Sequence, residues 1–348
     1  MSRQPESNHT VDFIIIGQGL AGSILAHQLF LRGKTVYVID DDHFQSSTKV
    51  AAGIINPITG PRLSLTNNFN EYYPRAKDLY TSLEKIFKSK LWQELPQHRS
   101  IRNQTQLEFH DKRIHDINYL NSLGGKITSP YFDNELSVIE VFQSAVIDTK
   151  NLITKTQNWL MSLNSYQSSK LNYQKIKIIN NGFAVNGIQA HQIVFCEGYQ
   201  AIHNPWLKHL PFKLSKGEIL TIDTDLPSTH LLNWGNWLTP VGSSAKLGSN
   251  YQWDDLSHRP SQLIKSQLLD SLHTHTCLKG RVTNHEVGIR PTTRQRTPFI
   301  GPITNLTGAY CFNGFGSKGC LLIPHYVDVF CEYLLNNTPL DKDLTQWL

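Results

Sequence analysis

A glycine-rich turn near the N-terminus constrains the fold of this chain more than any other feature. Residues 17–22 read Gly-Gln-Gly-Leu-Ala-Gly, follow a short apolar run over 11–16, and precede a segment with helical spacing that extends to Arg32. An apolar β-branched run predicts a buried strand, and glycines at this spacing predict a tight turn onto a helix. A second buried strand is expected over residues 35–39. The sequence therefore predicts a βαβ unit.

Each glycine of the turn has its own physical role. Gly17 permits the tight turn, Gly19 lets the backbone approach a pyrophosphate, and Gly22 lets the helix pack closely against the strand. The free N–H groups at the start of the helix favour an anion, and an acid at the end of the second strand can accept hydrogen bonds from ribose hydroxyls. The predicted dinucleotide-binding residues here are Gly17, Gly19, Leu20, Ala21, Gly22, Asp40 and Asp41. The motif alone does not distinguish FAD from NAD.

Composition limits the remaining possibilities. The 348 residues are 39% hydrophobic and 18% charged, which predicts an ordinary globular protein of two domains. A formal charge of +5, spread along the chain, gives no indication of nucleic-acid or membrane binding. The five cysteines have no C-x-x-C spacing and are expected to be reduced, and the early apolar run is too short for a signal peptide or a membrane span. We therefore expect a cytoplasmic protein.

The order of patterns along the chain predicts two interleaved domains. Residues 65–130 have amphipathic helical spacing, 176–195 give short strands that return to the first sheet, and 213–253 alternate as antiparallel strands do. A helix is expected from Ile323 to Leu335. The expected dinucleotide-binding domain comprises residues 1–64, 141–211 and 288–348, and the expected substrate domain comprises 65–140 and 212–287.

Four later segments accompany the N-terminal turn: Ser-Thr-Lys-Val-Ala-Ala-Gly at 47–53, Val-Phe-Cys-Glu-Gly at 194–198, Gly-Ile-Arg-Pro at 288–291 with Thr-Pro-Phe-Ile-Gly-Pro at 297–302, and the glycine turn at 314–319. In this order and spacing the chain resembles the D-amino-acid oxidase superfamily, which includes glycine oxidase, sarcosine oxidase and the oxidase domain of a bifunctional tRNA-modifying enzyme. Residues 65–140 carry little of the likeness. The resemblance implies an α/β fold, with a Rossmann-like FAD-binding domain and an interleaved α+β substrate domain containing an antiparallel sheet.

The resemblance also implies which later residues bind FAD. In similar enzymes the loop matching residues 51–53 lies along the flavin, and the turn matching 314–319 directs backbone N–H groups at its pyrimidine end. Lys318 would add a positive charge there, the alternative being a solvated loop lysine. No cysteine lies between Arg290 and Pro302, so noncovalent FAD is expected. These cofactor residues are Ser47, Ala51, Ala52, Gly53, Ile54, Gly198, Gly314, Gly316, Ser317, Lys318 and Gly319.

Two residues are implicated in binding the substrate by the same resemblance. Arg290 stands where amino-acid oxidases have the arginine that grips a substrate carboxylate through its planar fork, the alternative being an arginine in a surface ion pair. Trp237 takes the position that D-amino-acid oxidase fills with tyrosine, so a hydroxyl contact is lost; the alternative is a core aromatic. Both alternatives remain open at this point.

Lys246 is the expected oxygen activator. The segment Lys246–Asn250 is similar to the strand of sarcosine oxidase that holds a lysine over the flavin, although a lysine on a sheet edge is often only solvated. The implied activity is oxidation of a small amine or amino acid to an imine, by hydride transfer to flavin N5, with oxygen as acceptor. Two alternatives are a tRNA-modifying oxidase acting on carboxymethylaminomethyl uridine and a flavin dehydrogenase that passes electrons to a partner. No metal is expected.

Overall fold

The computed structural model describes residues 10–42, 46–133 and 135–348, which form two compact units. The first contains the residues up to Lys49 together with Lys150–Leu214 and Arg290–Leu348, and the second contains Val50–Thr149 and Ser215–Ile289. The chain is interleaved, and residues 50–64 and 141–149 group with the second unit rather than with the dinucleotide-binding one.

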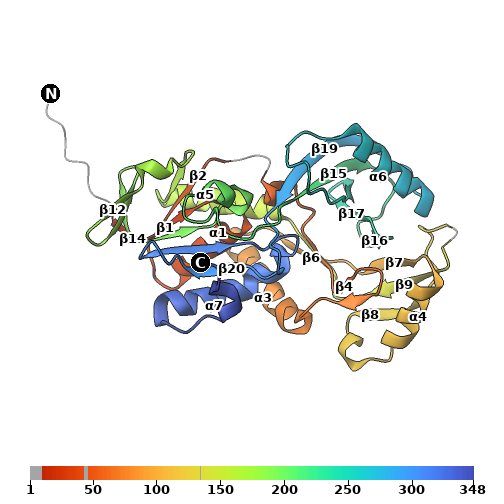
Figure 1. Ribbon diagram of the computed structural model, residues 1–348. Helices are drawn as coiled ribbons and strands as arrows, with labels where there is room; N and C mark the ends of the chain where they lie inside the picture. The colour runs from red at the N-terminus through yellow and green to blue at the C-terminus, as the bar shows by residue number, and fades with distance from the viewer. Residues whose placement is uncertain (1–9, 43–45, 134) are drawn as a thin grey trace. The chain divides into compact units, whose positions relative to one another are not determined.

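The first unit is built on a sheet whose central strands are parallel (Figure 1). Its strands are β1 (Thr10–Ile16), β2 (Val36–Asp40), β11 (Tyr166–Ser168), β12 (Lys177–Ile179), β13 (Gly182–Val185), β14 (Ile188–Phe195), β20 (Phe299–Pro302) and β21 (Ala309–Asn313). β1 pairs in parallel with β2 on one side and with β14 on the other. β14 pairs with antiparallel β13 along its first half and with parallel β21 along its second half. The carboxyl ends of β1, β2, β14 and β21 therefore meet at one edge.

The predicted βαβ unit is confirmed. Helix α1 (Leu20–Leu31) joins β1 to β2, and Gly33 follows it with a φ of +74°, the left-handed conformation that glycine adopts most easily. The other helical segments of this unit or its borders are α2 (Ser47–Val50), α5 (Thr149–Ser162), η2 (Tyr173–Lys175), η3 (Gly198–His203), α7 (Gly319–Asn336) and α8 (Lys342–Thr345). α7 begins four residues before the predicted start at Ile323, directly after the last glycine turn.

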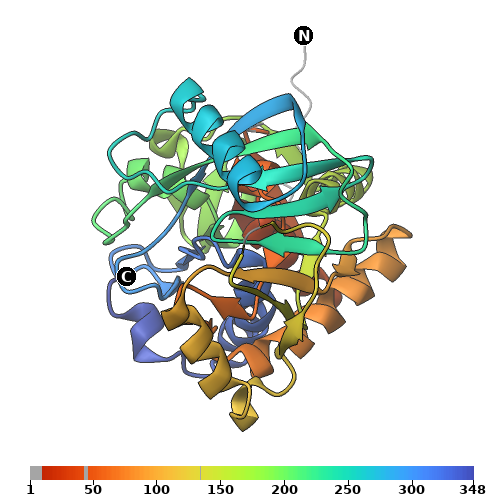
Figure 2. The ribbon, with the colours of Figure 1, turned by 90° about the vertical axis from the view of Figure 1, so that its right-hand side faces the viewer.

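The second unit is built on an eight-stranded sheet in the order β19-β15-β18-β17-β16-β7-β9-β8. These strands are β7 (Gln97–Ile101), β8 (Leu123–Ile127), β9 (Ser137–Val141), β15 (Ser215–Asp223), β16 (Leu231–Asn233), β17 (Trp237–Val241), β18 (Ser244–Gly248) and β19 (Arg281–Arg290). Helix α6 (Gln262–His275) covers one face, where Ile264, Leu268 and Leu272 pack against leucines of the strands (Figure 2). The predicted antiparallel strands of 213–253 are confirmed as β15 and β18.

The prediction of a helical region over residues 65–130 was only partly right. Helices α3 (Phe69–Phe87) and α4 (Gln104–Arg113) and the turn η1 (Ile117–Tyr119) are present, but β6 (Trp92–Glu94), β7 and β8 lie between and after them. The sequence of β7, Gln-His-Arg-Ser-Ile, is polar, yet all five residues are buried. Side-chain hydrogen bonds explain this, because the Arg99 guanidinium donates to the carbonyls of Ile58 and Gly60 at 2.7 Å. The remaining short strands are β3 (Ile54–Ile55), β4 (Ile58–Thr59), β5 (Ser64–Leu65) and β10 (Ala145–Ile147).

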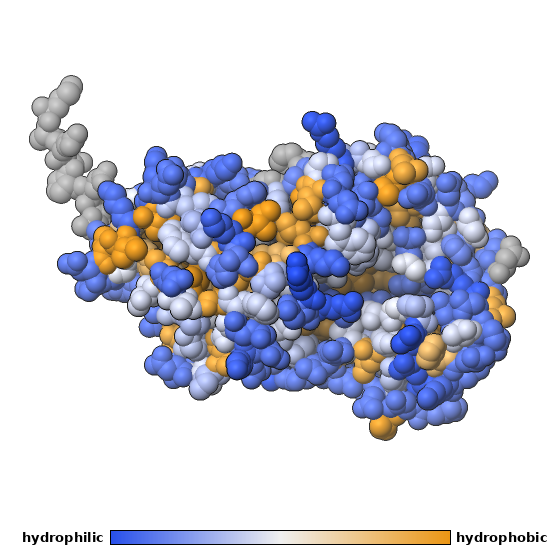
Figure 3. Space-filling model, viewed as in Figure 1, coloured by the Kyte–Doolittle hydropathy of each residue, from blue (hydrophilic) through white to orange (hydrophobic). Residues whose placement is uncertain are grey.

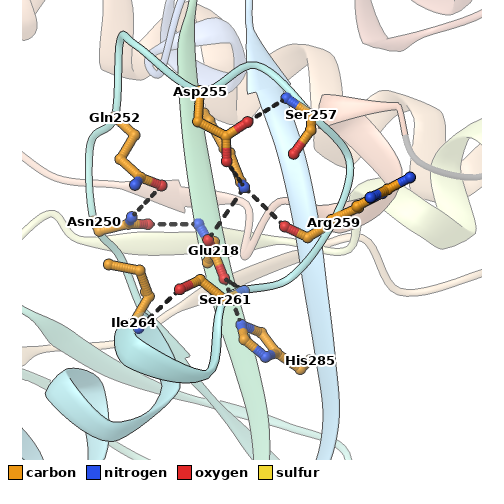
Figure 4. A network of polar contacts seen from close by, with 10 residues as sticks. Glu218, Asn250, Gln252, Asp255, Ser257, Arg259, Ser261, Ile264 and His285 are labelled. Atoms are coloured by element: carbon orange, nitrogen blue, oxygen red, sulfur yellow. Dashed lines mark hydrogen bonds and ion pairs between the residues drawn. The ribbon is translucent and has the colours of Figure 1, made fainter.

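A buried ionic network fastens the loop between β18 and α6 to β15 (Figure 4). Lys216 and Glu218 of β15 are both fully buried, with Nζ and Oε1 3.5 Å apart. Lys216 Nζ also donates to Asp255 Oδ2 at 2.6 Å and to the Arg259 carbonyl at 2.8 Å. Glu218 Oε2 accepts the Ser261 N–H at 2.8 Å. Lys216 is thus held mainly by hydrogen bonds to this loop, and the buried Glu218 carboxylate faces that cation.

His285 of β19 completes the network with its Nε2 2.8 Å from Glu218 Oε2. Burial lowers the pKa of the imidazole, whereas the Glu218 carboxylate acts in the opposite direction. The net shift of this pKa is downward, because Lys216 and Lys265 also disfavour the protonated ring. His285 is therefore neutral near pH 7.

The distribution of apolar residues on the surface and the state of the cysteines are those expected of a globular protein. Apolar residues on the face seen in Figure 3 form small groups among hydrophilic ones. Cys196, Cys311, Cys320 and Cys331 are buried as free thiols, and Cys277 is exposed. Within residues 10–42, 46–133 and 135–348, none of the helices combines the length and the apolar character needed to cross a bilayer.

Candidate functional site

Two glycines of the first turn stand where a side chain has no room. A Cβ on Gly22 would lie 1.9 Å from the Gly17 carbonyl oxygen, which is far inside any real contact. Gly17 has a φ of +99°, and a Cβ there would lie 2.6 Å from the carbonyl oxygen of Cys196 at the end of β14. The turn therefore fits tightly between β1, α1 and β14. Such close packing leaves its backbone uncovered by side chains and available to a phosphate.

The start of α1 presents backbone N–H groups toward this turn. Gly19 is the N-cap and supplies no side-chain acceptor, and the Leu20 N–H donates to Thr48 Oγ1 at 3.1 Å. Thr48 was missed by the sequence interpretation, which chose the neighbouring Ser47. The first turn of any helix leaves N–H groups without intrahelical acceptors, and here they lie beside glycines. The arrangement is suited to an anion.

Asp40 ends β2 beside the same turn. Its Oδ2 accepts the Gln18 N–H at 2.7 Å and its Oδ1 accepts the Asp42 N–H at 2.7 Å. Burial raises the pKa of Asp40, although both hydrogen bonds act to lower it. Asp41, the other predicted acid, is exposed. The structure thus brings Asp40 to the predicted turn, with carboxylate lone pairs left for further donors.

The last glycine turn packs against the segment that follows Arg290. The Gly316 N–H donates to the Pro291 carbonyl at 3.2 Å, and a Cβ on Gly316 would lie 2.9 Å from Thr292 Cγ2. Arg290 itself is the half-buried last residue of β19. Lys318 is the exposed N-cap residue of α7, with Ser317 before it and Gly319 after it. The predicted arginine and the predicted turn therefore adjoin within one unit.

Asn313 connects Gly198 and Gly314, two of the predicted cofactor residues. The sequence analysis did not predict a role for it. Its Nδ2 donates to the Gly198 carbonyl at 2.9 Å, and its Oδ1 accepts the Gly314 N–H at 2.8 Å. The side chain is 2% exposed. The sequence did offer a signal for this role, because an amide side chain at the end of an apolar strand, directly before a glycine turn, is expected to be buried and hydrogen-bonded.

In the second unit Lys246 meets the loop that contains Ala51. Its Nζ donates to the carbonyl oxygens of Val50 at 2.9 Å and Ala51 at 3.0 Å. β18 lies between β15 and β17, so the expectation of a lysine on a sheet edge was wrong. The side chain is half-buried and held by these carbonyls, which argues against the alternative of a merely solvated lysine.

The loop at 51–54 is pressed against β10. Gly53 has a φ of +71°, and a Cβ there would lie 1.9 Å from the Ile147 carbonyl oxygen. The Ile147 N–H donates to the Gly53 carbonyl at 3.0 Å. Ala52 is buried and Ile54 is half-buried. Only glycine fits at position 53, as the predicted loop requires.

Trp237 of β17 lies across Gly248 on the strand beside it. The two residues are register partners, and a Cβ on Gly248 would lie 2.6 Å from the Trp237 indole. The half-buried ring also packs against an apolar cluster formed by Leu95, Val146 and Leu231. Thr239 pairs with Lys246 one step along the same strands. Trp237 and Lys246 thus lie on adjacent strands, two residues out of register, and the indole packs against core residues.

A dinucleotide fits the first unit on steric and chemical grounds. Cβ atoms would fill the space at Gly17 and Gly22 of the turn at residues 17–22, the turn adjoins the N-terminus of α1, and Asp40 accepts a backbone N–H of the same turn. No cluster of three or more His, Cys, Asp or Glu side chains in the described part of the chain is arranged to hold a metal ion. A second glycine turn, at 314–319, lies in the same unit.

Known proteins match both the sequence and the fold. Residues 164–327 match the model of the DAO family, FAD dependent oxidoreductase. The tRNA 5-methylaminomethyl-2-thiouridine biosynthesis bifunctional protein MnmC of Legionella pneumophila is 24% identical over 318 residues, which cover 84% of this chain and 46% of that protein. The chain thus spans about half the length of the curated relatives it matches.

Among solved structures, the fold is similar to glycine oxidase from Bacillus cereus, with a TM-score of 0.80 and 17% identity over 96% of this chain and 97% of that one. It is also similar to iminodiacetate oxidase from Chelativorans, with a TM-score of 0.76 and 16% identity over 95% and 98% of the two chains. The family match, the similar folds and the glycine turn at residues 17–22 all indicate a dinucleotide cofactor. Residues 164–327 thus match a family of FAD dependent oxidoreductases, and the fold of the chain is similar to that of glycine oxidase.

Proposed function

We propose that this protein oxidises the C–N bond of a small amine or amino acid to an imine and that oxygen accepts the electrons. The placement of Lys246 carries the proposal. Its ammonium is held by the carbonyls of Val50 and Ala51, on the loop that lies along the flavin in similar enzymes. A cation at that place stabilises the negative charge that oxygen gains when it accepts an electron. The glycine oxidase and iminodiacetate oxidase folds are compatible with this reaction class.

FAD, when bound, accepts a hydride from the carbon beside the amine nitrogen. The protein's own part is positioning. The Arg290 guanidinium pairs with a substrate carboxylate through two parallel hydrogen bonds, which fixes the direction of the amine. Trp237 and its apolar cluster exclude water from one side of the substrate. Lys246 supplies positive charge, and the amine must arrive uncharged for its carbon to release a hydride.

The direct test is anaerobic reduction of the purified flavoprotein by a panel of amino acids, N-methylated glycines and simple amines without a carboxylate. We expect bleaching of the flavin absorbance by at least one amine. If no amine bleaches the flavin, the proposal is wrong. Noncovalent FAD, which we also propose, is checked by its release from the protein on acid precipitation.

The Arg290→Lys variant tests the carboxylate grip. We expect KM for a carboxylate substrate to rise about tenfold to a hundredfold, because a charged bidentate hydrogen bond is worth about 1.5–3 kcal/mol. KM for a matched amine without a carboxylate should stay constant. An equal loss for both substrates would mean that Arg290 acts only structurally.

The Lys246→Met variant tests the oxygen role. We expect reoxidation of the reduced flavin by oxygen to slow by about a hundredfold, the usual loss when one electrostatic group at a reacting centre is removed. Reduction by substrate, measured separately by anaerobic stopped flow, should change little. Lys126→Met, at an exposed lysine of the same unit, is the control. Wild-type reduced protein that persists in air would instead support a dehydrogenase that passes electrons to a partner.

A second candidate substrate is a tRNA that carries carboxymethylaminomethyl uridine, itself a secondary amine. The observation that favours it is the sequence match to the MnmC proteins over 84% of this chain. The mild formal charge of +5 does not by itself indicate RNA binding. Binding of modified tRNA that weakens steeply with salt, together with bleaching of the flavin by that tRNA, would decide for this candidate.

A further inference from the structure

A carboxyl group that the proposed reaction does not use lies beside the first glycine turn. Glu197 is the second residue after the end of β14, and a Cβ on Gly17 would lie 3.2 Å from its Cα. Its Oε1 accepts the Tyr173 hydroxyl at 2.7 Å, and its Oε2 accepts Asn204 Nδ2 at 2.7 Å. Both donors are neutral. Each oxygen therefore has a hydrogen bond, but neither of these partners neutralises a negative charge.

Among the described residues, no cation is found among the groups that shift the pKa of Glu197. Cys196 precedes it and Cys311 faces it from β21, and burial raises the pKa of both thiols well above the ordinary value. The Asp41 carboxylate acts on Tyr173 and Tyr199 from the end of β2. Burial raises the pKa of Glu197 to about 7, against the two hydrogen bonds, which lower it. The carboxyl group therefore holds a proton more readily than an ordinary glutamate does.

We propose that Glu197 is a proton-binding site coupled to FAD: its carboxylate takes up one proton from solvent when the negatively charged diphosphate of FAD binds at the adjoining turn. Added negative charge disfavours a second anion nearby, so the bound state favours the protonated carboxyl. By linkage, FAD then binds more tightly at low pH and more weakly as the pH rises through the range in which the free carboxyl ionises. The inference depends on the cofactor alone and holds whichever amine is oxidised.

The test is the equilibrium release of FAD from the diluted holoprotein, followed through the recovery of free-flavin fluorescence between about pH 6 and 8.5. One pKa unit of difference between the free and bound states corresponds to a limit of tenfold in affinity, so we expect Kd to rise about fivefold to tenfold. Calorimetric titration of FAD into flavin-depleted protein, in buffers of different ionisation enthalpy, should show proton uptake near pH 7.5. A flat Kd with no proton exchange would overturn the proposal.

Glu197→Gln is the decisive variant, because it resembles the protonated carboxyl. Its Oε1 can accept from Asn204, and the Tyr173 hydroxyl can turn to accept from its Nε2. We expect its Kd for FAD to equal that of the wild type near pH 6, to stay constant with pH, and to be the tighter of the two at pH 8.5. Glu332→Gln, which removes an exposed carboxylate from the same unit, should keep the wild-type dependence. If the Kd of Glu197→Gln for FAD depended on pH as that of the wild type does, another group would bind the proton, and the proposal would be contradicted.

Discussion

Replacement of Gly22 by alanine is expected to leave the protein without FAD. The added Cβ would lie 1.9 Å from the Gly17 carbonyl oxygen, so α1 must move away from the turn that it caps. Overpacking of this kind costs about 1–3 kcal/mol of folding free energy. It also displaces the first N–H groups of the helix, so we expect FAD affinity to fall about a hundredfold or more, equal to about 2.8 kcal/mol.

The measurement is the flavin-to-protein absorbance ratio of the purified variant, followed by its Kd for added FAD. Gly125→Ala is the matched control, because a Cβ at that glycine meets open space and its φ is not positive. The control should purify with the wild-type flavin content. Full flavin occupancy in Gly22→Ala would show that the turn can relax and that it is not the cofactor site.

Replacement of Lys216 by methionine is expected to cause the largest loss of stability in the second unit. The fully buried Glu218 carboxylate would lose its cation, and the Arg259 carbonyl would lose its donor. Breaking one partner of a buried ion pair costs about 3–5 kcal/mol. Faster amide hydrogen exchange in peptides from β15 and the loop between β18 and α6 would measure it. Lys126→Met breaks an exposed pair with Asp111, which solvent screens, and should leave the exchange rates near those of the wild type.

The loss in Lys216→Met should depend on pH through His285. Lys216 is one of the groups that lower the pKa of this imidazole, and Glu218 raises it. Without the lysine, the folded-state pKa of His285 rises, although burial still lowers it. The folded variant therefore accepts a proton more easily than the folded wild type does, and this advantage is present at low pH and is lost as the pH rises through the folded-state pKa of the variant. The variant should therefore be less destabilised near pH 5.5 than near pH 8. An equal loss of stability at both pH values would show that His285 is not the source of the pH dependence.

The sequence predicted the parts of the fold that repeat a local rule. The βαβ unit was predictable because strand, turn and helix are each encoded by neighbouring residues, and Gly33 ended the helix as expected. β7 was not predictable in the same way. Its polar residues are buried because Arg99 donates to carbonyls about forty positions earlier in the chain, a long-range effect that no local pattern carries.

The residues of the candidate site likewise differ in whether a local sequence pattern could predict them. The glycines at 17, 22 and 53 were predictable because each requires a conformation or a close approach that only glycine allows. Thr48, Asn313 and Glu197 were missed, since a hydroxyl, an amide or a carboxyl gains its role from the partner it meets in space. The contacts of Lys246 with Val50 and Ala51 join positions nearly two hundred residues apart.

The interleaving of the units has a consequence for how the protein is made. The chain passes from one unit to the other at residues 49–50, 149–150, 214–215 and 289–290. β21 and α7, which the first unit needs, are translated after both segments of the second unit. While they are still inside the ribosome, β14 lacks the β21 strand and that part of its edge is exposed. The first unit therefore completes its fold only after Arg290–Leu348 has emerged, and nascent protein depends until then on protection from aggregation.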